Sequence, residues 1–439
     1  MGQAFGWSTN IADILFTLEN EILFQDMFIP GLGLNIVRYN AGASSWVAAN
    51  GDYMKASPRI KRSRQMDAFW TNWDSSDPES DSWDWSVDAN QRNMMLMGRD
   101  RGVNHFELFS NSPVWWMCYN HNPSGSDFGY SDNLQKWNLQ NHTVYLANIA
   151  QHYRDVYGLN FTSVDAFNEP TSKTWFFDGA QEGCHFDVST QEIVIEYLYD
   201  EFLARGMENV AVAASDENNF QSCYDTWRAF SNVTQDFVDK INCHGYEYGH
   251  GPRAGIYYEA NSTGKVLWMS EYGEGDASGM SMATNMLLDF TELHPTAWVY
   301  WQILDIPGWG MIVADDNTNT TSYPVATKYF VFCQFTRHIR EGMLMIGSED
   351  PNTMAAYDRV KKDLVIITVN HGTAQWISYD LSNFQYPEGP KMVDRWVTNT
   401  ESQDNLYQHY RDTTFEYSYF EAFFETNTIQ TFVVHNITF

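Results

Sequence analysis

Short apolar segments alternate with amphipathic helical segments between residues 8 and 339, and this alternation restricts the possible folds most strongly. Most of the apolar segments are continuously apolar rather than alternating, which is typical of parallel strands covered on both faces. Strands that alternate with helices in this way indicate βαβ units and an α/β fold. The seven predicted strands span residues 34–39, 103–109, 162–169, 210–214, 241–246, 266–271 and 297–303.

Amphipathic helical segments flank and separate these strands. Residues 8–18 place apolar side chains on one helical face, and a longer apolar stripe over residues 146–157 stops at Gly158, a favourable residue after a helix C-terminus. A closed (β/α)8 TIM barrel has eight strands, so we expect that its first strand is missing from this chain. An open doubly wound sheet is the alternative. Further helices are predicted at residues 189–206, 282–293 and 326–339.

The pattern changes after residue 341. Strand-like segments there are separated by polar or Gly/Pro turns, without a helical signal between them. We therefore predict two domains, a catalytic barrel over residues 1–341 and an antiparallel β-sandwich over residues 342–439. The predicted sandwich strands span residues 363–369, 375–379, 391–397, 415–424 and 428–435.

Two carboxylates stand at the C-terminal ends of predicted barrel strands. Glu169 ends the segment 162–169, and Glu271 ends the segment 266–271. Active sites of such barrels lie at this end of the strands, and two carboxylates suffice to cut a glycosidic bond without a cofactor or metal. Pro170 is expected to hold Glu169 extended. The sequence therefore predicts a glycosidase that needs no cofactor.

Composition excludes several partners. The net charge is −30 with only 26 basic residues, so a nucleic acid would be repelled. No segment is long and apolar enough to span a membrane. Aromatic residues make up 16% of the chain, and their flat rings suit sugar faces. A polysaccharide substrate is therefore expected, with the protein acting as a monomer.

Cysteines and glycosylation acceptors bear on the compartment. The five cysteines are too sparse for a disulfide scaffold; they form one or two disulfides or remain buried thiols. The N-terminal residues lack a signal peptide, yet six Asn-X-Ser/Thr acceptors favour an extracellular protein, so we expect a processed or incomplete chain. The acceptors are Asn141, Asn160, Asn232, Asn261, Asn319 and Asn436.

Several motifs, in matching order along the chain, resemble glycoside hydrolase family 30. Within that family the chain is most similar to the fungal endo-β-1,6-galactanases, because the loop Asn120–Ser126 follows the tryptophan pair of the second motif. The resemblance implies a retaining, endo-acting enzyme with a (β/α)8 barrel and an attached β-sandwich. The motifs are Gly31–Trp46, Phe109–Trp116, Ala166–Pro170, Gln181–Cys184 and Trp268–Tyr272.

The same resemblance implies roles for individual residues. Glu169 would be the acid/base and Glu271 the nucleophile, and Asn168 would bind the sugar 2-hydroxyl. Arg38 and Tyr246 would keep Glu271 ionised and oriented, although a purely structural role is the alternative for both. Tryptophans are candidates for substrate binding, with core packing as the alternative: Trp46, Trp115, Trp175, Trp301 and Trp309.

Other possibilities stay open at this point. A β-1,6-glucanase of the same family is the nearest alternative, and the expected loss of a strand makes a catalytically impaired carbohydrate-binding protein a second one. His244 is expected to be a hydrogen-bonded strand residue rather than a metal ligand. The segment 315–319 has calcium-like acidic spacing but lacks the glycine and distal glutamate of an EF-hand, so a solvated loop is favoured.

Overall fold

A computed structural model describes residues 2–314, 322–386 and 389–438. The calcium-like segment 315–319 therefore lies outside the described residues. The chain forms two compact units, which we describe separately. The first comprises Met1–Ala12, Asn35–Tyr272 and Pro295–Trp301, and the second comprises Asp13–Leu34, Gly273–His294 and Gln302–Phe439.

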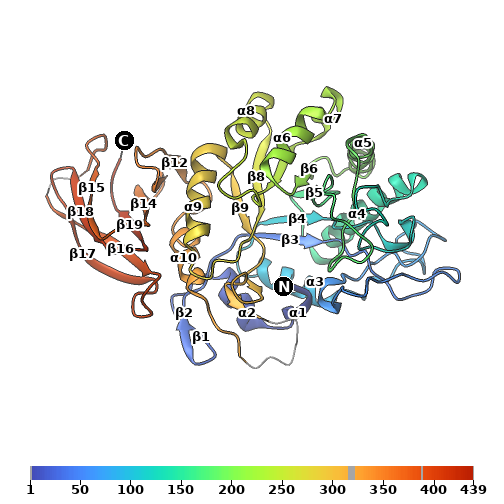
Figure 1. Cartoon of the computed structure of the whole chain (residues 1–439), viewed down its shortest axis with the longest axis horizontal. Coiled ribbons are helices and arrows are strands. Elements are labelled where there is room, and N and C mark those ends of the chain that lie inside the picture. Colours follow the sequence, from blue (N-terminus) through green and yellow to red (C-terminus); the bar gives the residue numbers. More distant parts are fainter. Residues whose placement is uncertain (1, 315–321, 387–388, 439) are drawn as a thin grey trace. The chain divides into compact units, whose positions relative to one another are not determined.

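The first unit is built on a parallel sheet of seven strands within the described residues (Figure 1). Each strand pairs with the next one along the chain, in the order β3 to β9. A doubly wound sheet would reverse direction at a switch point, so this sequential order identifies the curled sheet of a nearly closed barrel. All seven predicted strand positions are confirmed. The strands are β3 (Ile36–Asn40), β4 (His105–Phe109), β5 (Ser163–Asp165), β6 (Ala211–Glu217), β7 (Lys240–His244), β8 (Val266–Tyr272) and β9 (Ala297–Tyr300).

Helices connect successive strands of this sheet, as βαβ units require. Helix α4 buries the predicted apolar stripe, including Leu146 and Ile149, and ends at Gly158, whose φ of 60° suits a glycine. The helices are α1 (Gly2–Phe5), α2 (Thr9–Phe16, which continues into the second unit), α3 (Ala89–Arg99), α4 (Leu139–Tyr157), α5 (Val188–Ala204), α6 (Phe220–Ala229), α7 (Asn232–Phe237) and α8 (Arg253–Thr263), with 3-10 turns at Arg62–Arg64, Trp115–Met117 and Lys136–Asn138.

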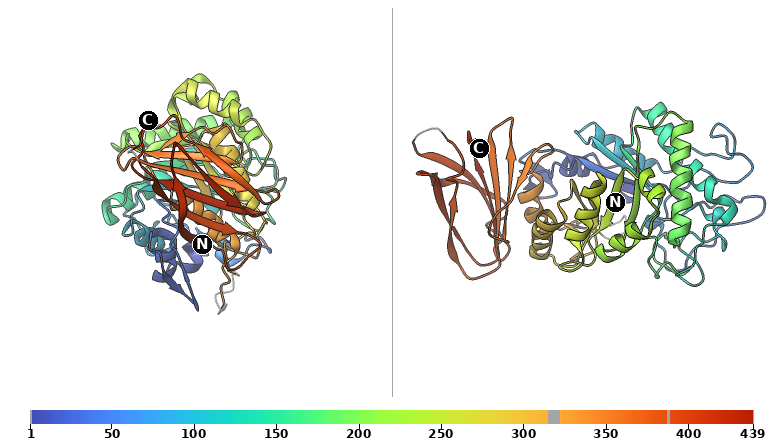
Figure 2. Two further views of the ribbon diagram at one scale, coloured as in Figure 1. Left: turned by 90° about the vertical axis from the view of Figure 1, so that its left-hand side faces the viewer. Right: turned by 90° about the horizontal axis from the view of Figure 1, so that it is seen from above.

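The second unit contains two facing antiparallel sheets, and their two layers are visible in the right-hand view of Figure 2. The larger has the strand order β12-β13-β14-β19-β16-β17, and the smaller pairs β15 with β18. Rings from both sheets form its core: Tyr379 lies 4.6 Å from Phe420 and 5.1 Å from Phe432, between ring centroids. The predicted β-sandwich is thus confirmed.

Two details of the sandwich differ from the prediction. Strands β12 and β13 lack a clear sequence pattern and were not predicted. The single strand expected at residues 415–424 is a hairpin, because Tyr417 and Ser418 both adopt positive φ (50° and 66°) and turn the chain. The strands are β12 (Leu344–Ile346), β13 (Thr353–Asp358), β14 (Asp363–Asn370), β15 (Gln375–Asp380), β16 (Lys391–Asn399), β17 (Gln408–Phe415), β18 (Tyr419–Phe424) and β19 (Thr428–Val434).

The remainder of the second unit is helical or forms short strand pairs. Its elements are β1 (Ile22–Phe24), β2 (Met27–Ile29), α9 (Met280–Leu288) continued by a π-helix (Asp289–Leu293), β10 (Leu304–Asp305), β11 (Ile312–Val313) and α10 (Thr327–Thr336). The predicted domain boundary at residues 341 and 342 stays a prediction. All five cysteines are buried free thiols. Within the described ranges, the helices are too short or too polar to cross a bilayer.

Candidate active site

Glu169 and Glu271 come from different strands of the barrel sheet, and the fold brings them together. Glu271 lies within β8, and Glu169 lies in the loop four residues after β5 ends. Carboxylate oxygens of the two residues, together with a ring nitrogen of His244 from β7, all lie within 4.8 Å of one another. Residues separated by about a hundred positions therefore share one site.

The backbone at Glu169 is not extended, so the expectation for Pro170 is wrong. Glu169 has a φ of 49°, in the left-handed region that residues other than glycine rarely adopt. Its N–H donates to the carbonyl of Asp216 (2.8 Å), and its carbonyl accepts the indole N–H of Trp175 (2.9 Å). The bond to Asp216, which follows another strand, and the bond from Trp175, later in the same loop, together fix this turn.

Arg38 of β3 joins three carboxylates and is itself buried, with 6% of its side chain exposed. Its Nη1 donates to Glu271 Oε2 (3.1 Å), its Nη2 to Asp216 Oδ2 (2.5 Å) and its Nε to Glu107 Oε1 (2.8 Å). The planar guanidinium suits this fixed set of acceptors. Arg38 therefore holds Glu271 in place and adds positive charge beside it, and it also forms ion pairs with Glu107 and Asp216. Its implied role in catalysis stays a prediction.

Tyr246 and His244 contact Glu271 from the neighbouring strand and its loop. The hydroxyl of Tyr246 donates to Glu271 Oε1 (2.9 Å), and His244 Nδ1 lies 3.7 Å from the same oxygen. Both groups contact Oε1, whereas Arg38 contacts Oε2. Glu271 is thus held from two sides, which leaves its orientation little freedom.

His244 is a charged member of the site that the sequence did not reveal. It is fully buried; its Nδ1 lies 3.3 Å from Glu169 Oε1 and its Nε2 3.0 Å from Asp216 Oδ1. Burial lowers the pKa of His244, but the negative charges of Asp216 and Glu271 outweigh this and raise the pKa well above its usual value. His244 is therefore an imidazolium that lies between the two glutamates.

Opposing effects act on the ionisation of Glu271. Burial raises the pKa of Glu271 above its usual value, whereas the charges of His244 and Arg38 lower it. Removal of either cation would leave burial less opposed and favour the protonated carboxylic acid. The two cations therefore favour the ionised form of Glu271.

Asp216 and Asn218 are further residues that sequence reasoning missed. Asp216 has a φ of 62° at a bulge of β6, and it accepts hydrogen bonds from Ser270 as well as Arg38. Asn218 Nδ2 donates to Glu169 Oε1 (2.9 Å). Both follow the predicted strand at residues 210–214. Polar residues directly after a barrel strand are candidates for the active site, so this position could have identified them.

Beneath these residues a polar network fills the barrel interior. Glu107 forms an ion pair with Lys240 and accepts hydrogen bonds from Asn242 and Ser163. Since Glu107 also binds Arg38, the network anchors Arg38 from below. The buried charges of Glu107, Lys240 and Arg38 are thus each paired with an opposite charge, which offsets the free-energy cost of removing them from water.

Comparison with known proteins identifies the family to which this site belongs. A model of O-glycosyl hydrolase family 30 matches residues 5–246. An endo-beta-1,6-galactanase of Hypocrea rufa is 52% identical over 436 residues, which cover 99% of this chain and 90% of that protein. This chain belongs to glycosyl hydrolase family 30. It is therefore a glycosidase.

Solved structures with low sequence identity share the fold of this family 30 chain. A conserved exported protein from Bacteroides fragilis has a TM-score of 0.78 and 17% identity, covering 98% of this chain and 95% of that one. A family 30 subfamily 8 xylanase from Clostridium acetobutylicum has a TM-score of 0.68 and 16% identity, covering 98% and 92%. Both likenesses concern the barrel and β-domain architecture.

The remaining predicted substrate-binding residues of this family 30 chain differ in exposure. Trp115 is fully buried and Trp175 is 7% exposed, which favours the core-packing alternative for both. Trp46 is 61% exposed and donates its indole N–H to Gln65 (3.2 Å). Asn168 is buried next to Glu169, and the half-buried Trp301 faces the guanidinium of Arg64. Trp309 is half-buried in the second unit.

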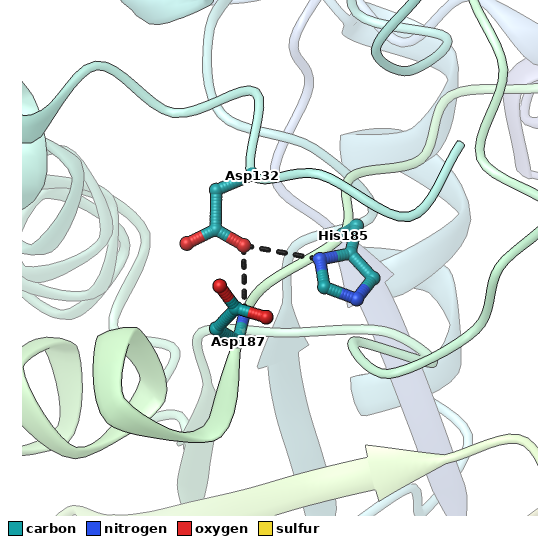
Figure 3. Close-up of side chains that lie close together, drawn as sticks. All are labelled: Asp132, His185 and Asp187. Carbon is teal, nitrogen blue, oxygen red and sulfur yellow. Dashed lines mark hydrogen bonds and ion pairs between the residues drawn. The ribbon is translucent and has the colours of Figure 1, made fainter. Parts of the chain in front are cut away.

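A second carboxylate–histidine group, Asp132, His185 and Asp187, is shown in Figure 3. Asp132 Oδ1 lies 3.0 Å from His185 Nδ1 and accepts the backbone N–H of Asp187 (2.6 Å), while Oδ2 accepts the hydroxyl of Thr190 (2.6 Å). Both oxygens of Asp132 are thus already engaged. The group joins the loop after β4 to the start of α5, and the absence of a metal site stays a prediction.

Glu182, from the family motif Gln181–Cys184, is a buried carboxyl that joins two loop segments. Its Oε1 accepts hydrogen bonds from Ser44 Oγ (2.6 Å) and the backbone N–H of Met66 (3.1 Å). Burial raises the pKa of Glu182 to about 8, although these hydrogen bonds oppose the shift. The folded protein therefore keeps this proton well above the pH at which the unfolded chain releases it.

The sign of the resulting pH dependence can be tested with Glu182→Gln. Between the unfolded pKa near 4.5 and the folded pKa near 8, the unfolded chain binds fewer protons, so this group lowers the free energy of unfolding as pH rises. Relative to the parent, the variant should gain stability at about 1.4 kcal/mol per pH unit across this window. Urea unfolding at pH 5, 6, 7 and 8 measures the difference. A difference between the variant and the parent that stays constant with pH would contradict the assignment.

Proposed function

We propose that this chain is a retaining endo-β-1,6-galactanase that hydrolyses β-1,6-galactan side chains of arabinogalactan. The observation that carries the proposal is the 52% identity, over 99% of the chain, to an endo-beta-1,6-galactanase. The site geometry supports the reaction type. A retaining glycosidase needs its two carboxyl groups about 5–5.5 Å apart. One carboxylate oxygen of Glu169 lies within 4.8 Å of one of Glu271, which is compatible with that requirement.

In this proposal the two glutamates act in a double displacement. Glu271 attacks the anomeric carbon while Glu169 donates its proton to the departing glycosidic oxygen. Glu169 then removes a proton from water, which attacks the same carbon and releases Glu271. The sugar keeps its anomeric configuration because the carbon is inverted twice. Two carboxyl groups supply the proton transfers and the nucleophile.

The neighbouring residues support these roles. Arg38 and Tyr246 orient Glu271 through hydrogen bonds of 3.1 and 2.9 Å. Asn218 orients Glu169, and His244 supplies a positive charge near both glutamates. Asn168, adjacent to Glu169, would bind the sugar 2-hydroxyl.

We further propose that the protein acts outside the cell as a monomer. Four of its glycosylation acceptors, Asn160, Asn232, Asn261 and Asn436, are exposed and so accessible to modification. The acidic surface is consistent with a neutral polysaccharide substrate.

Parallel digestion of two polysaccharides tests the substrate. De-arabinosylated arabinogalactan should release β-1,6-linked galacto-oligosaccharides, measured as new reducing ends and resolved by chromatography, whereas the β-1,6-glucan pustulan should release little. Preferential hydrolysis of pustulan would replace the galactanase with a β-1,6-glucanase. Tight galactan binding without new reducing ends would indicate a carbohydrate-binding protein instead.

A further inference from the structure

Four exposed aromatic rings gather on two loops that follow barrel strands. Phe128 and Tyr130 lie in the loop between β4 and α4, and Phe176 and Phe177 lie in the loop between β5 and α5. Their side chains are 39% to 62% exposed. We call these four residues the aromatic platform. Large rings that stay exposed together on two neighbouring loops indicate a surface that binds a ligand, since rings of the hydrophobic core would be buried.

The two loops that carry the platform are hydrogen-bonded to each other. Ser126 N–H donates to the carbonyl of Trp175, and Phe177 N–H donates to the carbonyl of Ser126, each at 3.0 Å. Asn122 Nδ2 adds a bond of 2.7 Å to the carbonyl of Phe177. The platform is therefore preorganised, so a ligand would not have to order these loops on binding.

Glycines allow the rings and the two loops to approach closely. A Cβ at Gly129 would lie 2.7 Å from the ring of Phe176, and a Cβ at Gly125 would lie 2.1 Å from the carbonyl oxygen of Trp175. Gly125 and Gly129 also have φ values of 140° and 63°, which favour glycine. The ring of Phe176 thus lies against backbone in a fixed position while part of it stays exposed.

The platform is linked to the proposed catalytic site through Trp175. Trp175 immediately precedes Phe176, and its indole N–H donates to the carbonyl of Glu169 (2.9 Å). The far end of the first loop is fixed by Asp132 to the start of α5 (Figure 3). The loop that bears the proposed acid/base therefore also bears two of the four rings.

We propose that the aromatic platform binds galactosyl residues of the polysaccharide chain beyond the bond that is cut. This inference deepens the proposed galactanase function and depends on it. Galactose presents several C–H groups on one face, which pack on aromatic rings, while its hydroxyls can donate to carboxylates. Asp127 and Asp178 flank the rings in sequence. Asp178 forms an ion pair with Arg59 (3.3 Å), so the exposed Asp127 is the candidate acceptor.

Binding to β-1,6-galactan tests the platform in the otherwise inactive variant Glu271→Gln. Affinity electrophoresis in gels that contain the polymer should show about three- to tenfold weaker binding for each ring removed, from the free energy of aromatic packing. Suitable changes are Phe177→Ala and the double change Phe128→Ala with Tyr130→Ala. Tyr258→Ala, an equally exposed ring on α8, is the matched control and should bind like the parent.

Kinetics of the active enzyme separate binding by the platform from support of the fold. In the platform variants, KM for galactan should rise several-fold, whereas KM for a chromogenic galactobioside should change much less. Tyr130→Trp should bind galactan like the parent, because the substituted residue is still aromatic. Unchanged galactan binding in all platform variants, or equal losses on the polymer and the short substrate, would overturn the inference. Failure of the parent enzyme itself to cut galactan would instead overturn the proposed function.

Discussion

Glu271→Gln should reduce galactan hydrolysis by at least about 10⁴-fold, because an amide cannot form the glycosyl–enzyme ester. The fold should survive. Gln can still accept the hydrogen bond from Tyr246, and Arg38 keeps its bonds to Glu107 and Asp216. Loss of a carboxyl whose burial is already unfavourable adds no unpaired charge. Release of reducing ends measures activity, and circular dichroism with thermal unfolding measures the fold.

The matched control for this prediction is Glu196→Gln, the same chemical change at an exposed position on α5. It should leave both activity and unfolding temperature near those of the parent. Hydrolysis by Glu271→Gln within about tenfold of the parent would rule out Glu271 as the nucleophile. A large loss of thermal stability in that variant would instead assign Glu271 a mainly structural role.

Glu169→Ala should slow hydrolysis of natural galactan by roughly 10²–10⁴-fold, because both proton transfers lose their catalyst. An aryl galactoside with a good leaving group should still form the glycosyl–enzyme, so the second step becomes limiting. Azide needs no base and can enter the space left by the carboxylate. Added azide should therefore restore turnover of that substrate and yield a β-galactosyl azide, which nuclear magnetic resonance identifies.

The anomer of the azide product distinguishes the two glutamates. Glu271→Ala lacks the nucleophile, so azide would attack the substrate directly and give the α-galactosyl azide by a single inversion. An α product from Glu169→Ala would exchange the two assignments. Failure of azide to accelerate Glu169→Ala with an activated substrate would remove Glu169 from the acid/base role.

The strand positions of the barrel were predictable because each strand is a continuous apolar segment bounded by helices. Glu271 illustrates this: β8 is observed at Val266–Tyr272, one residue longer than predicted. The short strands β12 and β13 of the sandwich were missed because neither shows a strong alternating pattern in sequence. The hairpin at Tyr417 and Ser418 was missed because its positive φ values occur without Gly or Asn.

The site itself was only partly predictable. Glu169, Glu271 and Arg38 could be identified because they lie in family motifs, and Tyr246 because it ends the predicted strand at residues 241–246. The fold brings all four together. The conformation of Glu169 could not be predicted, because its left-handed backbone is held in part by a hydrogen bond to Asp216, which is distant in the sequence. Local preferences, including the restriction by Pro170, do not contain that information.

The sequence by itself determined the order of strands and helices and the family. It also showed which strands carry polar residues at their C-terminal ends. These follow from local periodicity and from motifs that are contiguous in the chain. The charge of His244 was decided only by the tertiary structure, because its pKa depends on carboxylates from other strands and loops of the barrel. Electrostatic free energy depends on distance in space, and strand pairing sets those distances.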